Sequence, residues 1–315
     1  MGIGVNLFLI FDSVLFNSTG LLFVVLGVFT LIRMAGFPDL TVDGSFTIGA
    51  ALYSVSLVNG FSTPTALLLA AVGGALGGLL TWTVNEHLGV GRVVSSVLSM
   101  IILILSTPYL SGGSTKSLLN VRSIHSTIEG LDATLTTALI GSRSYQAHLI
   151  FSSLWLTSFF ALGTLTLLAL NTRAGLRMRY AGSAASPTLV PKREQTMLLL
   201  GGLMAGNAIV ALGGAVEAQR RGGYTNNMGI GMLLVGLAVL VLGEALIKSV
   251  RKRDHLRLSE YALAILVGSI VYCTGIQLLL AVRIDFVDLR LLTALFLLLL
   301  LGIAGRAYSS STKLF

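Results

Sequence analysis

The residues best suited to transport chemistry lie in one polar segment, Gly36 to Ala51, at the mouth of an apolar stretch. Its candidate site residues are Asp39, Thr41, Asp43 and Ser45. Carboxylates and hydroxyls beside proline and glycine interrupt a helix and expose backbone polar groups, which a membrane interior tolerates only inside protein or beside a wet cavity. The segment predicts either a discontinuous helix beside a permeation path or an ordinary loop in which Asp43 or Ser45 caps the following helix.

A second segment of related character, Gly222 to Leu246, lies in the other half of the chain. It begins with Gly, Thr and Asn residues, including Asn227, and then runs apolar as far as Glu244. Glycine-rich interruptions at corresponding positions of two halves indicate a midplane site in transporters built from repeats. Asn227 therefore joins the candidate residues of the translocation path. For Glu244 we expect an i, i+4 ion pair with Lys248.

Motifs for catalysis and metal binding are missing from the sequence. It contains no GxxxxGK[ST], HExxH, GxSxG or CxxC, which are the signatures of phosphate binding, zinc hydrolysis, acyl transfer and thiol chemistry. The four histidines are scattered rather than set at ligand spacing. The single cysteine, Cys273, lies in an apolar run and is expected to pack rather than react. We expect no enzyme activity, no metal site and no cofactor bound by this chain.

The elements that position these residues must be membrane helices. Of the 315 residues, 54% are hydrophobic and 11% are charged, against roughly a quarter charged in soluble domains. The mean hydropathy is +0.88. This composition excludes a soluble fold, a disordered chain and a disulfide scaffold. The apolar runs are continuous rather than alternating, which favours an all-α polytopic membrane protein over a barrel.

The charge-free runs give about nine candidate spans, within a range of eight to ten, in a single domain over residues 1–315. They are 13–32, two within 44–85, 93–115, 144–172, 195–216, 222–243, 261–282 and 291–305. The N-terminal stretch has neither a basic region nor a cleavage pattern, so we expect no cleaved signal peptide. Glycine pairs within the runs predict close helix packing; these are Gly73 and Gly74, Gly77 and Gly78, Gly201 and Gly202, and Gly213 and Gly214.

The basic residues predict the orientation of the chain. The formal net charge is +8, and basic residues cluster in the loops at 173–193 and 248–257. By the positive-inside rule both loops face the cytoplasm. Counting spans from them places an external segment at about 111–147 and the C-terminus in the cytoplasm, while the side of the N-terminus stays open. The charge therefore indicates contact with membrane lipid and not with nucleic acid.

The cytoplasmic stretch at about 171–193 has the composition of a docking element. Small residues at 181–186 predict a short helix on the membrane surface, bounded by Pro187 and Pro191 and flanked by arginines. Two interpretations stay open from the residues alone: a basic loop that faces lipid, or a contact surface for a cytosolic partner.

Four segments resemble the permease subunits of bacterial ABC importers, in the branch that includes branched-chain amino acid and ribose permeases. They are FPDLTVDGSFTIGAA at 37–51, VVSSVLSMIIL at 93–103, TRAGLRMRYAGSAAS at 172–186 and MGIGMLLVGLAVLVLGEAL at 228–246. The similarity covers most of the chain. It is greatest to the sub-branch whose permeases work with tryptophan- or tyrosine-type binding lipoproteins.

The resemblance implies a type II importer-like helix bundle that pairs with a second permease copy, identical or paralogous, in the bacterial cytoplasmic (inner) membrane. An ABC ATP-binding subunit would hold ATP and Mg²⁺ on the cytoplasmic side, and an external binding lipoprotein would deliver an amino acid or similar small solute. Transport would proceed by alternating access. The stretch at about 171–193 would be the loop coupling the chain to the ATPase; its residues are Arg173, Arg177, Tyr180, Ala181, Gly182 and Ala184.

Two other functions stay open at this stage. An ion-coupled secondary transporter is the main alternative, motivated by Asp39, Asp43 and the interrupted helices. Such a carrier does not require a coupling loop, which is the feature that separates the two readings. A membrane-embedded enzyme or scaffold is disfavoured because no catalytic constellation is present in the sequence.

Overall fold

The computed structural model describes residues 7–118, 121, 171–182, 191–251 and 256–281, with single positions between 153 and 168 and at 298 and 302. Within this part of the chain the regular structure is helical apart from one short two-stranded antiparallel sheet. Seven of the described helices are long and apolar enough to cross a membrane. The chain is therefore an all-α polytopic membrane protein, which confirms the fold class predicted from composition.

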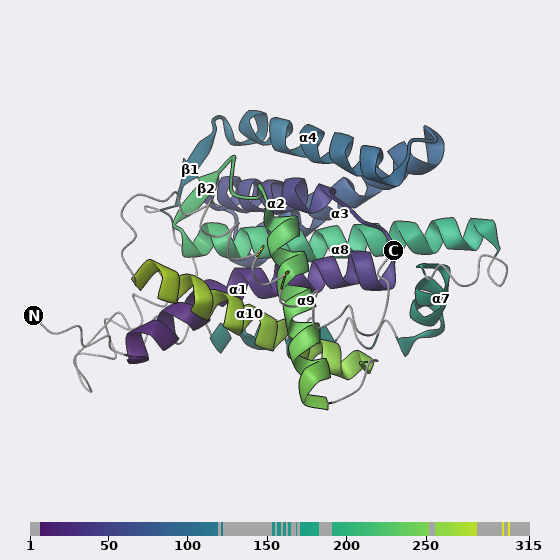
Figure 1. The fold of residues 1–315 in the computed structure, drawn as a ribbon. Coiled ribbons are helices and arrows are strands. Elements are labelled where there is room, and N and C mark those ends of the chain that lie inside the picture. Colours follow the sequence, from purple (N-terminus) through teal and green to yellow (C-terminus); the bar gives the residue numbers. More distant parts are fainter. Residues whose placement is uncertain are drawn as a thin grey trace, which may run out of the picture.

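The described elements follow the charge-free runs (Figure 1). In chain order they are α1 (Leu7–Phe29), the π-helical η1 (Thr30–Met34), α2 (Thr41–Val58), α3 (Thr63–His87), α4 (Arg92–Ser111), β1 (Thr115–Ser117), α7 (Arg173–Gly182), α8 (Lys192–Arg220), β2 (Gly223–Thr225), α9 (Met232–Arg251) and α10 (Leu258–Ala281).

The described helices correspond to seven of the predicted spans, with one correction. The span predicted at 222–243 begins about ten residues later, because residues 223–231 form a strand and turns before α9 starts. The span predicted at 291–305 and most of that at 144–172 lie outside the described residues. The same holds for most of the external segment predicted at 111–147.

Helix α8 lies at the centre of the bundle, in contact with α1, α2 and α3 (Figure 1). Its 29 residues extend about 43 Å, enough to cross a bilayer. Gly20 and Gly27 of α1 lie against Gly213 and Gly206 respectively, so α1 runs antiparallel to α8. Helix α2 runs parallel to α8, because contacts to α8 advance together along both helices.

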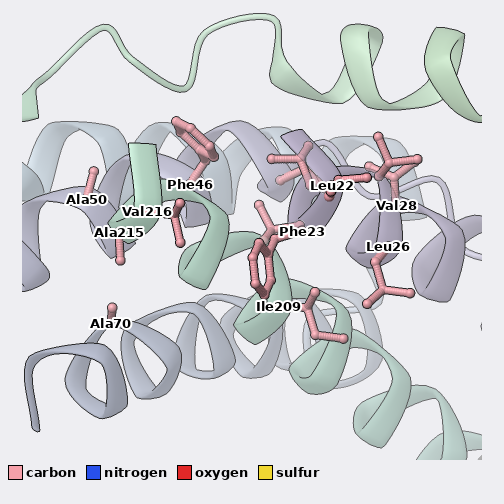
Figure 2. Close-up of a cluster of buried hydrophobic side chains, with 14 of the residues drawn as sticks. Leu22, Phe23, Leu26, Val28, Phe46, Ala50, Ala70, Ile209, Ala215 and Val216 are labelled. Atoms are coloured by element: carbon pink, nitrogen blue, oxygen red, sulfur yellow. The ribbon is translucent and has the colours of Figure 1, made fainter. Parts of the chain in front are cut away.

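The core fills the space between these helices. Figure 2 shows aliphatic and aromatic side chains of α1, α2, α3 and α8 gathered in one cluster. Its labelled members are Leu22, Phe23, Leu26, Val28, Phe46, Ala50, Ala70, Ile209, Ala215 and Val216. Glycine and alanine are the commonest buried residues of α8, and small residues of this kind let helix backbones approach closely in the absence of a hydrophobic driving force.

The predicted role of the glycine pairs in packing is confirmed. A Cβ on Gly78 would collide with the carbonyl oxygen of Leu203, and one on Gly214 would collide with that of Phe46. Backbone therefore contacts backbone where α3 and α2 cross α8. Gly201 is the exception, because a Cβ there would meet nothing within 4 Å.

Loops predicted to share a side of the membrane lie at the same end of the bundle. Trp82 Nε1, near the end of α3, donates to the Thr196 carbonyl in the first turns of α8 at 3.0 Å. Helix α7 packs on this end too, which we name the α7 end. At the opposite end β1 pairs antiparallel with β2, with Thr115 opposite Thr225. We name that the strand end.

Replacing Gly78 by alanine should lower the free energy of unfolding by about 1–3 kcal/mol, the usual cost of overpacking a core. Gly201→Ala is the matched control, and it should be neutral or stabilising by up to about 1 kcal/mol because alanine is the better helix former. The measurement is unfolding of the purified protein in mixed micelles, followed by circular dichroism. Equal effects of the two substitutions would contradict the backbone contact at Gly78.

Candidate functional site

The connection between α1 and α2 turns back inside the bundle. Helix α1 continues into η1, and the chain then reverses through Gly36, which has a φ of +64°. Ala35 lies against Gly202 of α8, and both Phe37 and Asp39 are fully buried. This turn therefore lies beside the middle part of α8 and not beyond its end. Helix α2 starts beside this part of α8, and the discontinuous-helix interpretation stays a prediction.

A polar centre, defined as Asp39, Thr41, Ser45, Thr81 and Asn207, joins α2, α3 and α8. Asn207 lies near the midpoint of α8; its Nδ2 donates to Asp39 Oδ2 at 2.6 Å, and its Oδ1 accepts from Ser45 Oγ at 2.7 Å. The hydroxyls of Thr41 and Thr81 are 2.6 Å apart. All five side chains are completely buried, so the structure brings three of the predicted site residues together.

The hydrogen bonds of the polar centre compensate the burial of its carboxylate. Asp39 Oδ1 accepts the backbone N–H of Thr41 at 2.9 Å, in the first turn of α2. Burial raises the pKa of Asp39, which lies between two spanning segments, while hydrogen bonds from Thr41 and Asn207 lower it in part. No salt bridge to Asp39 occurs within the described residues. The centre fixes the start of α2 against α8.

Asp43 bonds to a different helix from the one that contains it. Its Oδ2 accepts the backbone N–H of Gly231 at 2.7 Å, and its Oδ1 accepts that of Leu233 at 2.8 Å. These N–H groups belong to the first turn of α9, so the Asp43 carboxylate of α2 caps α9. A Cβ on Gly229 would collide with the Asp43 carbonyl oxygen. The two interrupted segments predicted from the sequence therefore meet directly.

The expectation that Asp43 or Ser45 caps the helix that follows is wrong. The residue before α2 is Leu40, which makes no side-chain capping bond. Ser45 bonds to Asn207 and Asp43 bonds to α9, because tertiary partners offer these groups better geometry than the first turn of their own helix. The cap of α2 comes instead from Asp39.

Asn227 lies apart from the polar centre. It is exposed in the turn before α9, where its carbonyl accepts the backbone N–H of Ile230. The neighbouring Asn226 is the residue whose side chain makes contacts: its Oδ1 accepts hydrogen bonds from Thr107 of α4 and from the Tyr224 hydroxyl. The sequence alone does not distinguish the exposed side chain of Asn227 from the hydrogen-bonded side chain of Asn226.

An ion pair connects α1 to α9 at the α7 end. Arg33 Nε and Nη2 donate to the two carboxylate oxygens of Glu244 at 2.9 and 2.8 Å. The predicted partner Lys248 is present as well, at 3.8 Å. Glu244 is buried, with 2% of its side chain exposed, whereas 28% of Arg33 is exposed. The i, i+4 expectation is confirmed, but the shorter contacts are those of Arg33, a residue 211 positions away.

The coupling-loop residues fall partly on a short helix. Helix α7 contains Arg173 and Arg177 and begins after Thr172, whose Oγ1 accepts the backbone N–H of Gly175. Arg177 pairs with Glu194 in the first turn of α8. Helix α7 carries Arg173 and Arg177 itself and reaches Gly182, whereas most of the helix expected at 181–186 lies outside the described residues. Residues 183–190, with Ala184, lie outside the described residues. For Tyr180, Ala181 and Gly182 only the helical backbone is described.

Sequence reasoning missed the central residue of the site. Asn207 is a lone amide in the middle of the run 195–216, and a polar side chain at the centre of an apolar span usually has a partner within the bundle. That signal was available from position alone. Thr81 and Arg33 gave no comparable signal, because threonine is common in such helices and Arg33 stands at the end of a span.

Comparison with known proteins gives two full-length relatives. The chain is 27% identical over 290 residues, 92% of its length and 90% of the relative's, to a protein of Clostridioides difficile (strain R20291) named tyrosine transport system permease protein. It is 23% identical over 282 residues, 90% of its length and 93% of the relative's, to an uncharacterized protein of Rickettsia prowazekii (strain Madrid E). No family model matches the chain, and no solved structure matches it.

Removal of the Asp43 carboxylate should destabilise the protein. Asp43→Ala leaves the N–H groups of Gly231 and Leu233 without a capping acceptor, which costs about 0.5–2 kcal/mol for a helix cap. Asp43→Asn retains one carbonyl oxygen and should lose less. Unfolding in mixed micelles measures both variants; an Asp43→Ala protein as stable as wild type would show that the cap contributes nothing.

The Arg33 and Glu244 pair should behave as a coupled unit. Arg33→Met alone leaves the buried Glu244 with only the more distant Lys248, and we expect a loss of about 3 kcal/mol, as for other broken buried pairs. The double variant Arg33→Met with Glu244→Leu should recover most of that loss, because no charge is then left in an apolar site. A double-mutant cycle measures the coupling, and purely additive effects would argue against it.

Proposed function

We propose that this chain is the transmembrane permease subunit of an ATP-driven importer. The observation that carries the proposal is the meeting of the first turns of two helices within the bundle, where the Asp43 carboxylate of α2 caps the half-buried start of α9. Helices that begin at membrane depth are the sequence and structural mark of transporters, since irregular backbone there is tolerated only beside protein or a solvent path. A full-length relative carries the name of a transport system permease.

The coupling to an ATPase is proposed from α7. This ten-residue helix presents exposed arginines at the α7 end of the bundle, with Arg177 60% exposed. The sequence has no phosphate-binding loop of its own, so ATP and Mg²⁺ would be held by a separate subunit that contacts α7 and the coupling loop. An external binding lipoprotein and a second permease copy would complete the importer.

The proposed cargo is an amino acid or a similar small solute. The support is the relative's name, which refers to tyrosine, together with the few fixed charges within the helices. The proposed membrane is the bacterial cytoplasmic (inner) membrane, with the α7 end and the C-terminus in the cytoplasm, by the positive-inside rule. By this assignment the strand end faces the binding protein.

One observation favours the alternative, an ion-coupled secondary transporter. Asp39 and Asp43 are carboxylates in the bundle interior and form no salt bridge with any described residue. Such groups occur in proton and sodium relays. All four of their oxygens nevertheless have hydrogen-bond donors within the bundle, which supports a fixed scaffold and ranks this function second.

The deciding experiment is uptake of radiolabelled amino acids into proteoliposomes. The chain is reconstituted alone, and also together with the ATP-binding subunit and binding protein that co-purify from its native host. The proposal expects uptake only in the complete system with ATP inside, and its loss when the partner's catalytic carboxylate is replaced. Uptake by the chain alone under a proton or sodium gradient would overturn the importer and establish the alternative.

Charge reversal at Arg177 should uncouple transport from ATP hydrolysis. Arg177→Glu places a second carboxylate beside that of Glu194 and removes a basic group that would face the ATPase. We therefore expect uptake to fall by about tenfold while ATP hydrolysis continues. The swap Arg177→Glu with Glu194→Arg separates two causes: restored uptake would assign the effect to the internal pair, and continued loss would assign it to the ATPase.

A further inference from the structure

A cavity of about 250 Å³ lies at the strand end, between α1, α8, α9 and α10. It is separate from the polar centre, and none of the residues described in that centre lines it. Most of its wall is apolar. The apolar side chains in the wall are Leu21, Val24, Phe46, Met232, Val235 and Ile276.

The polar part of the cavity wall consists of Tyr272 and Gln277 of α10 and of a charged cluster at the end of α8. Glu217, with 7% of its side chain exposed, accepts hydrogen bonds from Arg220 Nε at 2.8 Å and from Arg221 Nε at 2.6 Å. Arg220 also donates to Asn17 Oδ1 at 2.6 Å and lies 5.6 Å from the Phe16 ring centroid. Glu217 and Arg220 are therefore held in place by each other and by α1.

The cluster has one positive charge in excess. Its two arginines face a single carboxylate, and Arg220 pairs with that carboxylate through two nitrogens. Arg221 contributes only Nε to the bonds found in the described part of the chain, and 51% of its side chain is exposed. The guanidinium of Arg221 thus retains terminal N–H donors in a planar fork, the geometry that matches a carboxylate.

We infer that this cavity binds a small carboxylate with an apolar body, such as an arylalkanoate. The carboxylate lies on Arg221 at the charged side, and the body lies among Phe46, Met232 and Val235. A dry cavity of about 150 Å³ accommodates benzene, so the larger volume here has room for one ring and a short acidic tail. Ligand sites of about 300 Å³ and above take larger molecules.

The charge balance selects a monoanion over other ligands. Glu217 is already neutralised by Arg220, so among the described lining residues no carboxylate remains to bind a cation. A dianion would leave one negative charge unpaired against apolar walls, which is costly. A neutral molecule of the same shape would keep the apolar contacts but lose the bond to Arg221.

This inference goes beyond the proposed function, because binding at the strand end needs neither an ATPase nor transport. It is tested with the purified full-length chain in lipid nanodiscs, by equilibrium binding of radiolabelled 3-phenylpropanoate and of its amide, which has the same body without the charge. The acid should bind about tenfold or more tightly than the amide. Arg221→Gln should abolish this preference, and Arg221→Lys should retain part of it.

Two further comparisons locate the ligand. Arg193→Gln removes an exposed charge at the other end of α8 and should leave binding unchanged. Val235→Phe fills the cavity and should weaken the acid and the amide alike, whereas Leu234→Phe, on an exposed face of the same helix, should weaken neither. If Arg221→Gln does not fold, binding by Arg221→Lys tests the role of the guanidinium in a folded variant.

Three results would overturn the inference. The first is equal affinity for the acid and the amide in the wild-type protein. The second is unchanged binding in Val235→Phe. The third is stronger displacement of the probe by oleate than by unlabelled 3-phenylpropanoate, which would assign the charged cluster to a membrane lipid, since the cavity is too small for a long acyl chain.

Discussion

The structure depends on one constraint: a helix that begins inside a membrane bundle must find acceptors for its first N–H groups. Water is not available there, and an unsatisfied backbone group costs several kcal/mol. Asp43 meets this requirement for α9 from a neighbouring helix, and Asp39 meets it for α2. The position of α9 relative to α2 is consequently fixed by two hydrogen bonds that backbone N–H groups of α9 donate to a single carboxylate.

Close backbone packing makes these bonds possible. Asn207 reaches both Asp39 and Ser45 because α2 and α3 approach α8 where glycine removes the side chain, at Gly74 and Gly214 among others. With larger residues at these positions the helices would move apart and the buried polar groups would lose their partners. The small residues thus permit the polar centre, and the polar centre in turn fixes which faces of the helices meet.

Composition and charge spacing predicted much of the fold, since each apolar run has to be a helix of bilayer length. The polar segments at 36–51 and 222–246 were also recognised, because Pro38 and Asp39 in the first segment and the Gly and Asn residues that open the second are unfavourable within an apolar helix. What the sequence could not give was the pairing. Local rules assigned Asp43 to its own helix and Glu244 to Lys248, whereas the shortest contacts come from residues 188 to 211 positions away. Long-range partners of this kind depend on the packing of α8, which no single segment specifies.

The continuous segment of α1 and η1 is connected to its neighbours at two places, and this limits how the bundle can move. Toward the strand end Asn17 of α1 accepts a hydrogen bond from Arg220 of α8, and at the α7 end Arg33 of η1 pairs with Glu244 of α9. Helix α2 is bonded to both α8 and α9 through Ser45 and Asp43. These four helices therefore form a closed set of polar connections, and tilting one of them alone would break buried hydrogen bonds. In the proposed importer, alternating access is then a movement of this set as one body against its neighbours, driven through α7, which contacts the set at Glu194.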